Sequence, residues 1–236
     1  MYKKIIDFEI RPIFNPSDEI CKDFERIELR CDDYLGNIYK EEYRQSCWEY
    51  HKENFQNQNA FAFAAYHKNK MVGFSDGYAD DNVMNLDSLF VDPDFHGKGI
   101  GSGLLKNSEY ADSIIKSNME LMPLITAMDF YQKHRYVYGR NGVYMQKTLS
   151  APIPGVIPVF EWCDELTAKL NVKIDSALLR NCKGQPMFVC VNKYADIEGI
   201  ALRLPDGKDV IKFTKRGGDT AEQYKSKLVD ALSKTR

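Results

Sequence analysis

The chain reads LDSLFVDPDFHGKGIGSGLL from residue 86 to residue 105, and this stretch decides the fold. A strand pattern ends at Val91, glycines follow at 97, 99, 101 and 103, and an amphipathic helix opens among them. Glycines let the backbone approach a phosphate closely, and the unpaired N–H groups of a first helical turn point toward it. Lys98 could add positive charge. The stretch therefore predicts an anion cradle at the start of a helix.

Two common phosphate-binding patterns do not fit this loop. The P-loop pattern G-x-x-x-x-G-K-[ST] has no match in the chain. The dinucleotide pattern G-x-G-x-x-G fails because its third glycine falls on Ser102 when counted from Gly97, and on Leu104 when counted from Gly99. No glycine-rich turn follows the first predicted strand either. Both the P-loop and the Rossmann interpretations are therefore disfavoured.

The rest of the first 150 residues alternates strand and helix patterns. Strands are predicted over residues 3–13, 61–66, 71–78, 83–91, 121–125, 136–138 and 142–148. Helices are predicted from residue 17 or 18 onward in two pieces divided near Gly36, and over 101–117 and 127–134. The second piece, roughly 39–55, carries Tyr43, Cys47, Trp48 and His51 on one stripe.

A proline-rich segment divides the chain. Residues 151–158 read APIPGVIP, with three of the nine prolines. Proline removes backbone donors and fixes the backbone, so we expect a domain over 1–150, a linker over 151–159 and a small α+β domain over 160–236. That last domain has predicted helices over 160–170, 174–179 and from 219 onward, and strands over 187–191, 200–204 and 210–213.

Composition narrows the class of protein. The 236 residues are 44% hydrophobic and 28% charged, which is typical of a soluble globular protein. No apolar run approaches the roughly 18 residues of a membrane span, and the N-terminus lacks a signal-peptide core, so we expect a cytoplasmic protein without membrane contact. Residues 1–150 carry 18 Lys and Arg against 23 Asp and Glu, and the remainder 14 against 11, so nucleic acid is a disfavoured partner. The six cysteines form no C-x-x-C pair, which argues against a metal site.

Three segments in order resemble a known family. Residues 96–101 read HGKGIG, residues 127–136 read AMDFYQKHRY, and a closing strand pattern covers 143–149. The first resembles motif A of the GNAT-type N-acetyltransferase superfamily, Arg/Gln-x-x-Gly-x-Gly/Ala, and the second resembles the family's A-x-x-F-Y-x-K-x-G-F segment. The likeness covers about residues 1–150 and is strongest over 71–149. It implies an α+β (mixed α/β) GNAT-like acyl-CoA-binding fold, with a central, mostly antiparallel sheet flanked by helices. The C-terminal 80 or so residues resemble no family that we can name.

The resemblance implies acetyl-CoA as cosubstrate and an amine as acceptor. The backbone of Leu89 and Val91 would bind the pantetheine arm, Phe130 would pack on the cofactor, and Tyr131 would protonate the departing thiolate. The other positions carried over as cofactor-binding are Phe90, His96, Gly97, Lys98, Gly99, Ile100, Gly101, Ser102 and Lys133. A core tyrosine is the alternative interpretation of Tyr131. His96 replaces the usual Gln or Arg and Arg135 the usual glycine, and a plain loop histidine is the alternative for His96.

The acceptor amine must also lose a proton. Asp87 lies two residues before Leu89, so the two side chains share one face of an ideal strand, and Asp87 is the first candidate base. Asp76 is the second candidate, Tyr78 and Glu49 are weaker ones, and water alone or a structural role for these acids stays open. His51, His67 and His134 show no metal spacing, so we interpret them as surface or satisfied core histidines.

The sequence thus predicts an acetyltransferase that moves an acetyl group from acetyl-CoA to a primary amine by direct attack in a ternary complex. The acceptor would be a small-molecule or peptide amine, and a homodimer is an expectation from family habit. The alternative is a non-catalytic acyl-CoA-binding module whose C-terminal domain binds a partner.

Overall fold

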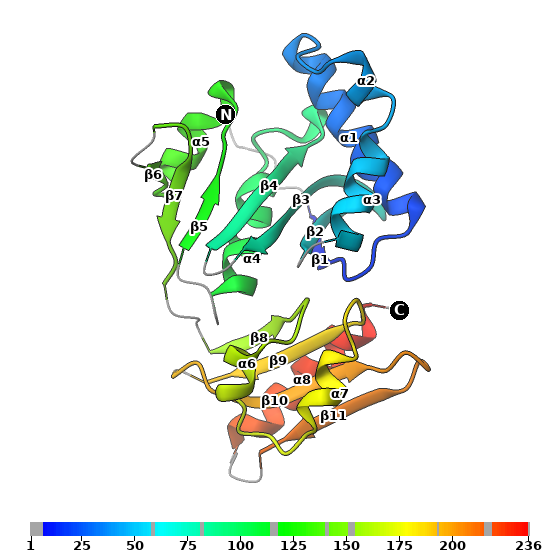
Figure 1. Ribbon diagram of the computed structural model, residues 1–236, viewed down its shortest axis with the longest axis vertical. Coiled ribbons are helices and arrows are strands. Elements are labelled where there is room, and N and C mark those ends of the chain that lie inside the picture. The colour runs from blue at the N-terminus through cyan, green and yellow to red at the C-terminus, as the bar shows by residue number, and fades with distance from the viewer. Residues whose placement is uncertain are drawn as a thin grey trace. The chain divides into compact units, whose positions relative to one another are not determined.

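The computed structural model describes residues 7–57, 60–80, 83–113, 118–139, 142–150, 154–192, 194–214 and 219–235. The chain divides into two compact units (Figure 1). The first comprises residues 1–109 and 117–149, and the second residues 110–116 and 150–236.

A seven-stranded sheet forms the centre of the first unit. Its strand order is β1-β2-β3-β4-β5-β7-β6, and every neighbouring pair is antiparallel except β4 with β5. The strands are β1 (Glu9–Pro12), β2 (Ala60–His67), β3 (Lys70–Asp80), β4 (Val83–Val91), β5 (Asn118–Leu121), β6 (Val137–Tyr138) and β7 (Met145–Thr148). The predicted mixed fold with a mostly antiparallel sheet is confirmed.

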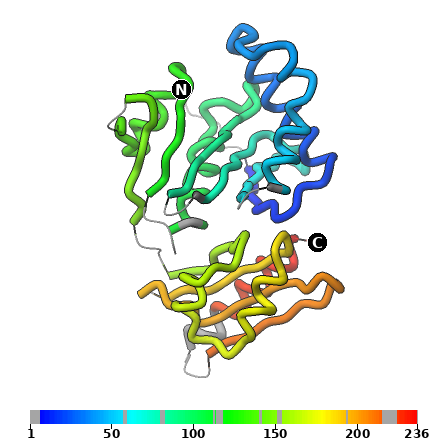
Figure 2. The backbone as a smooth tube through the Cα atoms, viewed as in Figure 1, coloured from blue at the N-terminus to red at the C-terminus, as the bar shows by residue number. Residues whose placement is uncertain are grey.

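Helices cover both faces of this sheet. Successive residues of β3 point to opposite faces, so neighbouring residues contact helices on opposite sides. The Phe74 ring stacks on Phe24 of α1 (Asp18–Leu35) with centroids 4.2 Å apart. Ser75, the next residue, meets Ser108 of α4 (Ile100–Asp112), with their Oγ atoms 3.0 Å apart. The blue and cyan helices α1 and α3 (Cys47–Asn57) therefore share one face (Figure 2), and α4 covers the other.

Local sequence explains where α1 begins and ends. The Ser17 side chain accepts a hydrogen bond from the Ile20 N–H at 3.4 Å, as an N-cap does. Gly36 ends the helix in the left-handed region at φ 94°, where glycine carries no Cβ penalty. The predicted break at Gly36 is confirmed, but the piece that follows is itself divided into α2 (Glu41–Arg44) and α3.

Two predicted elements around β5 are shifted. The strand expected over 121–125 instead ends at Leu121, because Pro123 lacks a backbone donor and a short 3-10 helix, η2 (Ile125–Ala127), follows. The helix expected to end at residue 117 ends at Asp112. Residues 114–117, and residues 3–6 of the first predicted strand, lie outside the described residues.

The second unit is a four-stranded antiparallel sheet with helices. The strand order is β11-β10-β9-β8, for β8 (Gly155–Pro158), β9 (Met187–Val191), β10 (Ile197–Arg203) and β11 (Asp209–Phe213). Its helices are α6 (Asp164–Ala168), α7 (Ser176–Arg180) and α8 (Asp219–Ser233). Residues 155–158, which lie inside the predicted linker, form an edge strand against β9 instead. Proline is compatible with an edge strand because only one side of that strand needs ladder donors.

Candidate active site

The glycine loop lies between β4 and α4 and is tied to α1. Asp92 caps the 3-10 helix η1 (Pro93–Phe95) through the Asp94 N–H at 3.1 Å, and Asp92 and Asp94 both accept from the Arg30 guanidinium, at 2.9 and 2.8 Å. Gly97 and Gly99 follow with φ of 70° and 88°, in the left-handed region that favours glycine. Helix α4 then begins at Ile100, so its first N–H groups open beside these two glycines.

A cavity of about 530 Å³ opens at this loop. Its lining includes eleven residues predicted for the site: Leu89, Phe90, Val91, His96, Gly97, Gly99, Ile100, Gly101, Ser102, Phe130 and Tyr131. A Cβ added at Gly97 or Gly99 would meet no atom within 4 Å, so the backbone there faces open space. The cavity thus offers backbone donors and apolar walls, which is the chemistry that an acyl-CoA needs at its pyrophosphate and pantetheine parts.

The open edge of β4 borders the same cavity. Among the described residues, β5 pairs with β4 over residues 83–86, while β4 continues to Val91. The Asp92 N–H donates to the Val72 carbonyl at 2.9 Å, on the β3 side. Backbone groups alternate between the two neighbours of an antiparallel strand, so Leu89 and Val91 turn theirs to the opposite edge. That arrangement suits the pantetheine-binding role predicted for Leu89 and, at Val91, for its N–H group, because the Val91 carbonyl oxygen already has Cys31 Sγ and His96 Nε2 as partners.

Several predicted side chains have other contacts. His96 Nε2 lies 2.7 Å from the Val91 carbonyl oxygen, and Lys98 donates to the Asp94 carbonyl at 2.6 Å. The Ile100 side chain is buried in the core, so only its backbone can serve a ligand. Lys98 and Lys133 do not line the cavity, and Lys133 is exposed on α5 (Met128–Lys133).

Tyr131 is buried and lines the cavity from α5. Burial raises the pKa of the Tyr131 phenol, so the phenol keeps its proton at neutral pH and is available as a donor. Phe130, beside it, contributes its ring to the cavity wall, where a Cβ at Gly101 would lie 3.6 Å from that ring.

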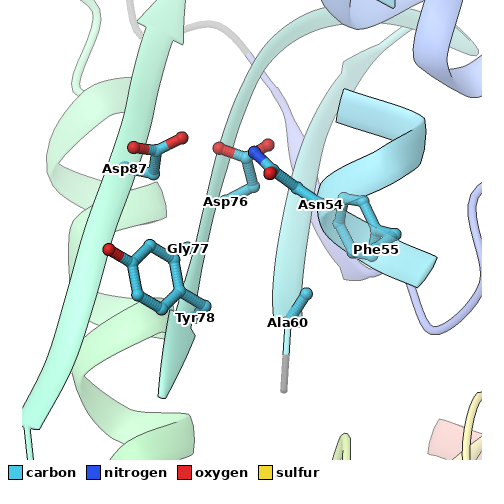
Figure 3. Close-up of a pocket in the computed structure, with 7 residues that line it drawn as sticks. All are labelled: Asn54, Phe55, Ala60, Asp76, Gly77, Tyr78 and Asp87. Carbon is cyan, nitrogen blue, oxygen red and sulfur yellow. The ribbon is translucent and has the colours of Figure 1, made fainter. Parts of the chain in front are cut away.

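A second, much smaller cavity of about 10 Å³ lies along the first half of β4. Asp76 of β3 and Asp87 of β4 line it, together with Tyr78 and residues of β2 and α3 (Figure 3). Asp76 lies opposite Ser88 while Gly77 lies opposite Leu86, so Asp87 is the extra residue of a β-bulge. The bulge aims the Asp87 side chain into this cavity. Glu49, also considered as a base, is exposed on α3 and lines neither cavity.

The pKa of the Asp87 carboxyl is raised. Surrounding protein atoms disfavour its charged form, and the nearby Asp76 carboxylate adds repulsion. A hydrogen bond from the Tyr50 hydroxyl to Asp87 Oδ2, at 2.9 Å, and the charge of His51 act in the opposite direction. A carboxylate with a raised pKa is a better proton acceptor than an ordinary aspartate.

Asp76 belongs to a row of three buried ionisable side chains, Glu28, His51 and Asp76, in which His51 lies between the two carboxylates. His51 Nδ1 lies 2.8 Å from Asp76 Oδ2, and His51 Nε2 lies 2.9 Å from Glu28 Oε2. Burial alone would lower the pKa of His51, but the two carboxylates outweigh it and raise that pKa. His51 was interpreted from the sequence as a surface or satisfied core histidine, and the structure confirms the core alternative. Glu28 was not considered. The one sequence feature that pointed to this site was the position of His51 on the stripe of the helix predicted over residues 39–55. Its partners lie 23 and 25 residues away along the chain, so no local pattern links them.

The structure also bears on metals and membranes. Within the described ranges, no group of three or more His, Cys, Asp or Glu side chains is arranged to hold a metal ion. Among the helices of the described chain, none is both long and apolar enough to span a bilayer.

Comparison with known proteins assigns part of the first unit to a family. Residues 58–138 match the family model described as acetyltransferase (GNAT) domain, and no curated protein matches the chain significantly. Among solved structures, the chain is similar to the PaiA N-acetyltransferase of Thermoplasma acidophilum in complex with coenzyme A, at 22% identity and a TM-score of 0.50. It is also similar to PH1933 of Pyrococcus horikoshii OT3, at 23% identity and a TM-score of 0.53. Each likeness covers 61% of this chain and 99% of the other. Residues 58–138 are therefore a GNAT-type acetyltransferase domain.

Proposed function

We propose that the protein transfers an acetyl group from acetyl-CoA to a primary amine by direct attack in a ternary complex. The observation that carries the proposal is the cavity at the glycine loop. It joins the first N–H groups of α4, the open edge of β4 and the buried Tyr131 in one space.

Acetyl-CoA would lie along this cavity. The N–H groups at the start of α4 would bind the pyrophosphate, helped by the positive end of the helix dipole. The backbone of Leu89 and Val91 would bind the pantetheine arm, and Phe130 would contact it through its ring. A backbone N–H near Leu89 would stabilise the oxyanion that forms on the thioester carbonyl.

The transfer itself needs two proton-handling groups. The amine nitrogen attacks the thioester carbonyl carbon, the C–N bond forms, and the C–S bond breaks. Asp87 takes the proton that the nitrogen loses, and Tyr131 donates a proton to the departing thiolate. Asp87 is preferred to Asp76 as the base because it is exposed and can pass its proton on to solvent.

Direct attack is favoured over an acetylated enzyme intermediate. Cys31 is the cysteine that lines the cavity, and its Sγ donates to the Val91 carbonyl oxygen at 3.2 Å. Burial, with repulsion from Asp92 and Glu28, raises the pKa of Cys31 to about 12. The thiol therefore stays protonated at neutral pH and is a poor nucleophile.

Calorimetric titration with acetyl-CoA tests the proposal. We expect the wild-type chain to bind, and Gly99→Glu to lose binding by more than about 100-fold through bulk and charge repulsion. Gly207→Glu is the matched control, because Gly207 also has a left-handed φ, of 83°, and open space around it, but lies in the second unit. No binding by folded wild-type protein would overturn the proposal.

Release of free thiol from acetyl-CoA, screened across amine classes, then tests transfer. Tight acetyl-CoA binding without acetylation of any amine would support the alternative, a non-catalytic acyl-CoA-binding module.

A further inference from the structure

The chain of buried side chains in the first unit ends on an oxygen without a donor. Glu28, His51 and Asp76 are 2%, 0% and 3% exposed. Asp76 Oδ2 faces His51, whereas Asp76 Oδ1 is buried and has no hydrogen-bond partner among the described residues. Because a buried carboxylate oxygen without a donor is strongly destabilising, this atom calls for a ligand. It belongs to the side chain that lines the small cavity beside Asp87.

The charges around this oxygen call for a cation. His51 is the cation paired with Glu28 and Asp76 in the part of the chain that the structure describes. Two carboxylates and one imidazolium leave a net charge of −1, and Asp87 adds a second negative charge at the cavity. The tyrosine hydroxyls and cysteine thiols that face these carboxylates are neutral at pH 7, because burial raises their pKa; they belong to Tyr39, Tyr43, Tyr50, Cys21, Cys31 and Cys47. A ligand that donates hydrogen bonds and carries positive charge would complete the arrangement.

The size of the cavity restricts the cation. Its volume of about 10 Å³ is room for roughly one water molecule. An ammonium group has about that size and three donors, whereas a planar guanidinium is much larger. The rest of the wall is formed by Asn54, Phe55, Ala60, Gly77 and Tyr78 (Figure 3). The apolar side chains of Phe55 and Ala60 suit the methylene group next to such a nitrogen.

We propose that this cavity is the acceptor's binding site, where the primary ammonium of an unbranched aliphatic amine is held between Asp76 Oδ1 and the Asp87 carboxylate. Asp76 binds the ammonium, and His51 and Glu28 are positioning residues that hold the Asp76 carboxylate in place. The inference rests on the proposed function, because the nitrogen held here is the one that is acetylated. The ammonium gives one proton to Asp87, which passes it on to solvent. The neutral amine then attacks, and Asp87 takes the second proton from the nitrogen as the amide forms, while Tyr131 protonates the departing thiolate. The neutral amide product loses its attraction to the two carboxylates and leaves.

The experiment titrates n-butylammonium into the full chain saturated with coenzyme A, and follows binding by calorimetry. Neutral n-butanol and n-butylguanidinium are the comparison probes. We expect wild-type protein to bind n-butylammonium at least about tenfold more tightly than either. Equal binding of n-butanol, or of n-butylguanidinium, would overturn the proposal.

Two variants test whether n-butylammonium binding depends on this cavity or only on the overall negative charge of the protein. Asp76→Asn keeps the size of the side chain but removes its charge, and we expect at least a tenfold loss of n-butylammonium affinity. Glu53→Gln removes one negative charge from an exposed position of the same helix, α3, and should leave affinity within twofold. Should Asp76→Asn fail to fold, Asp87→Asn at the exposed side of the cavity replaces it with the same expected loss. Unchanged affinity in the folded variant would overturn the proposal.

The positioning role of His51 has its own readout. Imidazole nitrogen NMR shifts, assigned by comparison with His51→Gln, should show wild-type His51 as an imidazolium at pH 8 and a neutral ring in Asp76→Asn. A neutral His51 in the wild type would overturn that role. Acetyl-CoA titration of the same samples distinguishes the failures: lost cofactor binding in the wild type rejects the proposed function, whereas intact cofactor binding without ammonium selectivity rejects only this inference.

Discussion

The two halves of β4 border two cavities that are built from different chemical groups. The second half, with the glycine loop, offers mainly backbone groups and apolar walls to a cavity of about 530 Å³. The first half, with its bulge at Asp87, offers charged side chains to a cavity of about 10 Å³. A cavity built from backbone depends on conformation and tolerates side-chain changes, whereas one built from buried charges depends on each partner.

The largest effect is expected where a buried charge loses its partner. His51→Ala leaves Glu28 and Asp76 facing each other without a cation, and breaking such a buried pair costs about 3–5 kcal/mol. Urea unfolding measures the loss. The control is His134→Ala, because His134 has neutral neighbours: its Nε2 lies 3.0 Å from the Ser102 hydroxyl and its ring packs on Phe130, with centroids 4.8 Å apart. Equal losses of unfolding free energy in His51→Ala and His134→Ala would contradict the expectation that the buried charges of the small cavity are the more sensitive to losing a partner.

The same histidine predicts a direction for stability against pH. The pKa of His51 is raised in the folded protein above its unfolded value of about 6.5. Its contribution is therefore fully present below pH ~6.5 and is lost as the pH rises through the folded-state pKa. The stability gap between wild type and His51→Ala should narrow on the alkaline side, and a gap that widens there would contradict this assignment.

Tyr131→Phe tests the one side-chain donor assigned in the larger cavity. We expect turnover to fall about 100-fold, in the range for loss of a general acid, with acetyl-CoA affinity largely unchanged. Steady-state kinetics and calorimetry measure the two quantities. Tyr138→Phe, on the exposed strand β6, is the control, and an unchanged turnover number in Tyr131→Phe would remove that residue from the general-acid role.

The pH profile tests Asp87 as the base. Activity needs the ionised carboxylate, so kcat/KM for the amine should fall as the pH drops through the raised pKa of Asp87, above the ordinary value of about 3.9. The Tyr50 hydrogen bond lowers that pKa. Tyr50→Phe should therefore move the acid limb to higher pH. A limb that stays in place, or moves to lower pH, would be the contrary result.

The smallest effect is expected at His96. Its ring is held by the Val91 carbonyl, and the neighbouring binding groups belong to the backbone. His96→Ala should change acetyl-CoA affinity by less than about twofold, measured by calorimetry beside Lys98→Ala. A tenfold loss would show that side chains, as well as backbone, define this cavity.

The contrast between the two cavities explains which features could be predicted from the sequence. The glycine loop could be recognised because backbone geometry needs glycine at particular positions, and the left-handed φ of Gly97 and Gly99 shows that need directly. The same reasoning placed β4 and the start of α4 to within a residue. Edge strand β8 was missed because its prolines indicated a linker, and only pairing with β9 makes it a strand.

The sequence by itself determined the strand, glycine loop and helix of the larger cavity, because these are local consequences of neighbouring residues. Only the tertiary structure decided the acidic cavity. Glu28 comes from α1, His51 from α3, Asp76 from β3 and Asp87 from β4. Their pairing depends on the packing of two helices on one sheet face and on one extra residue in β4, and no local pattern records either. Charged side chains from distant parts of the sequence meet only when the elements pack together, whereas the backbone donors of a helix start are positioned by neighbouring residues.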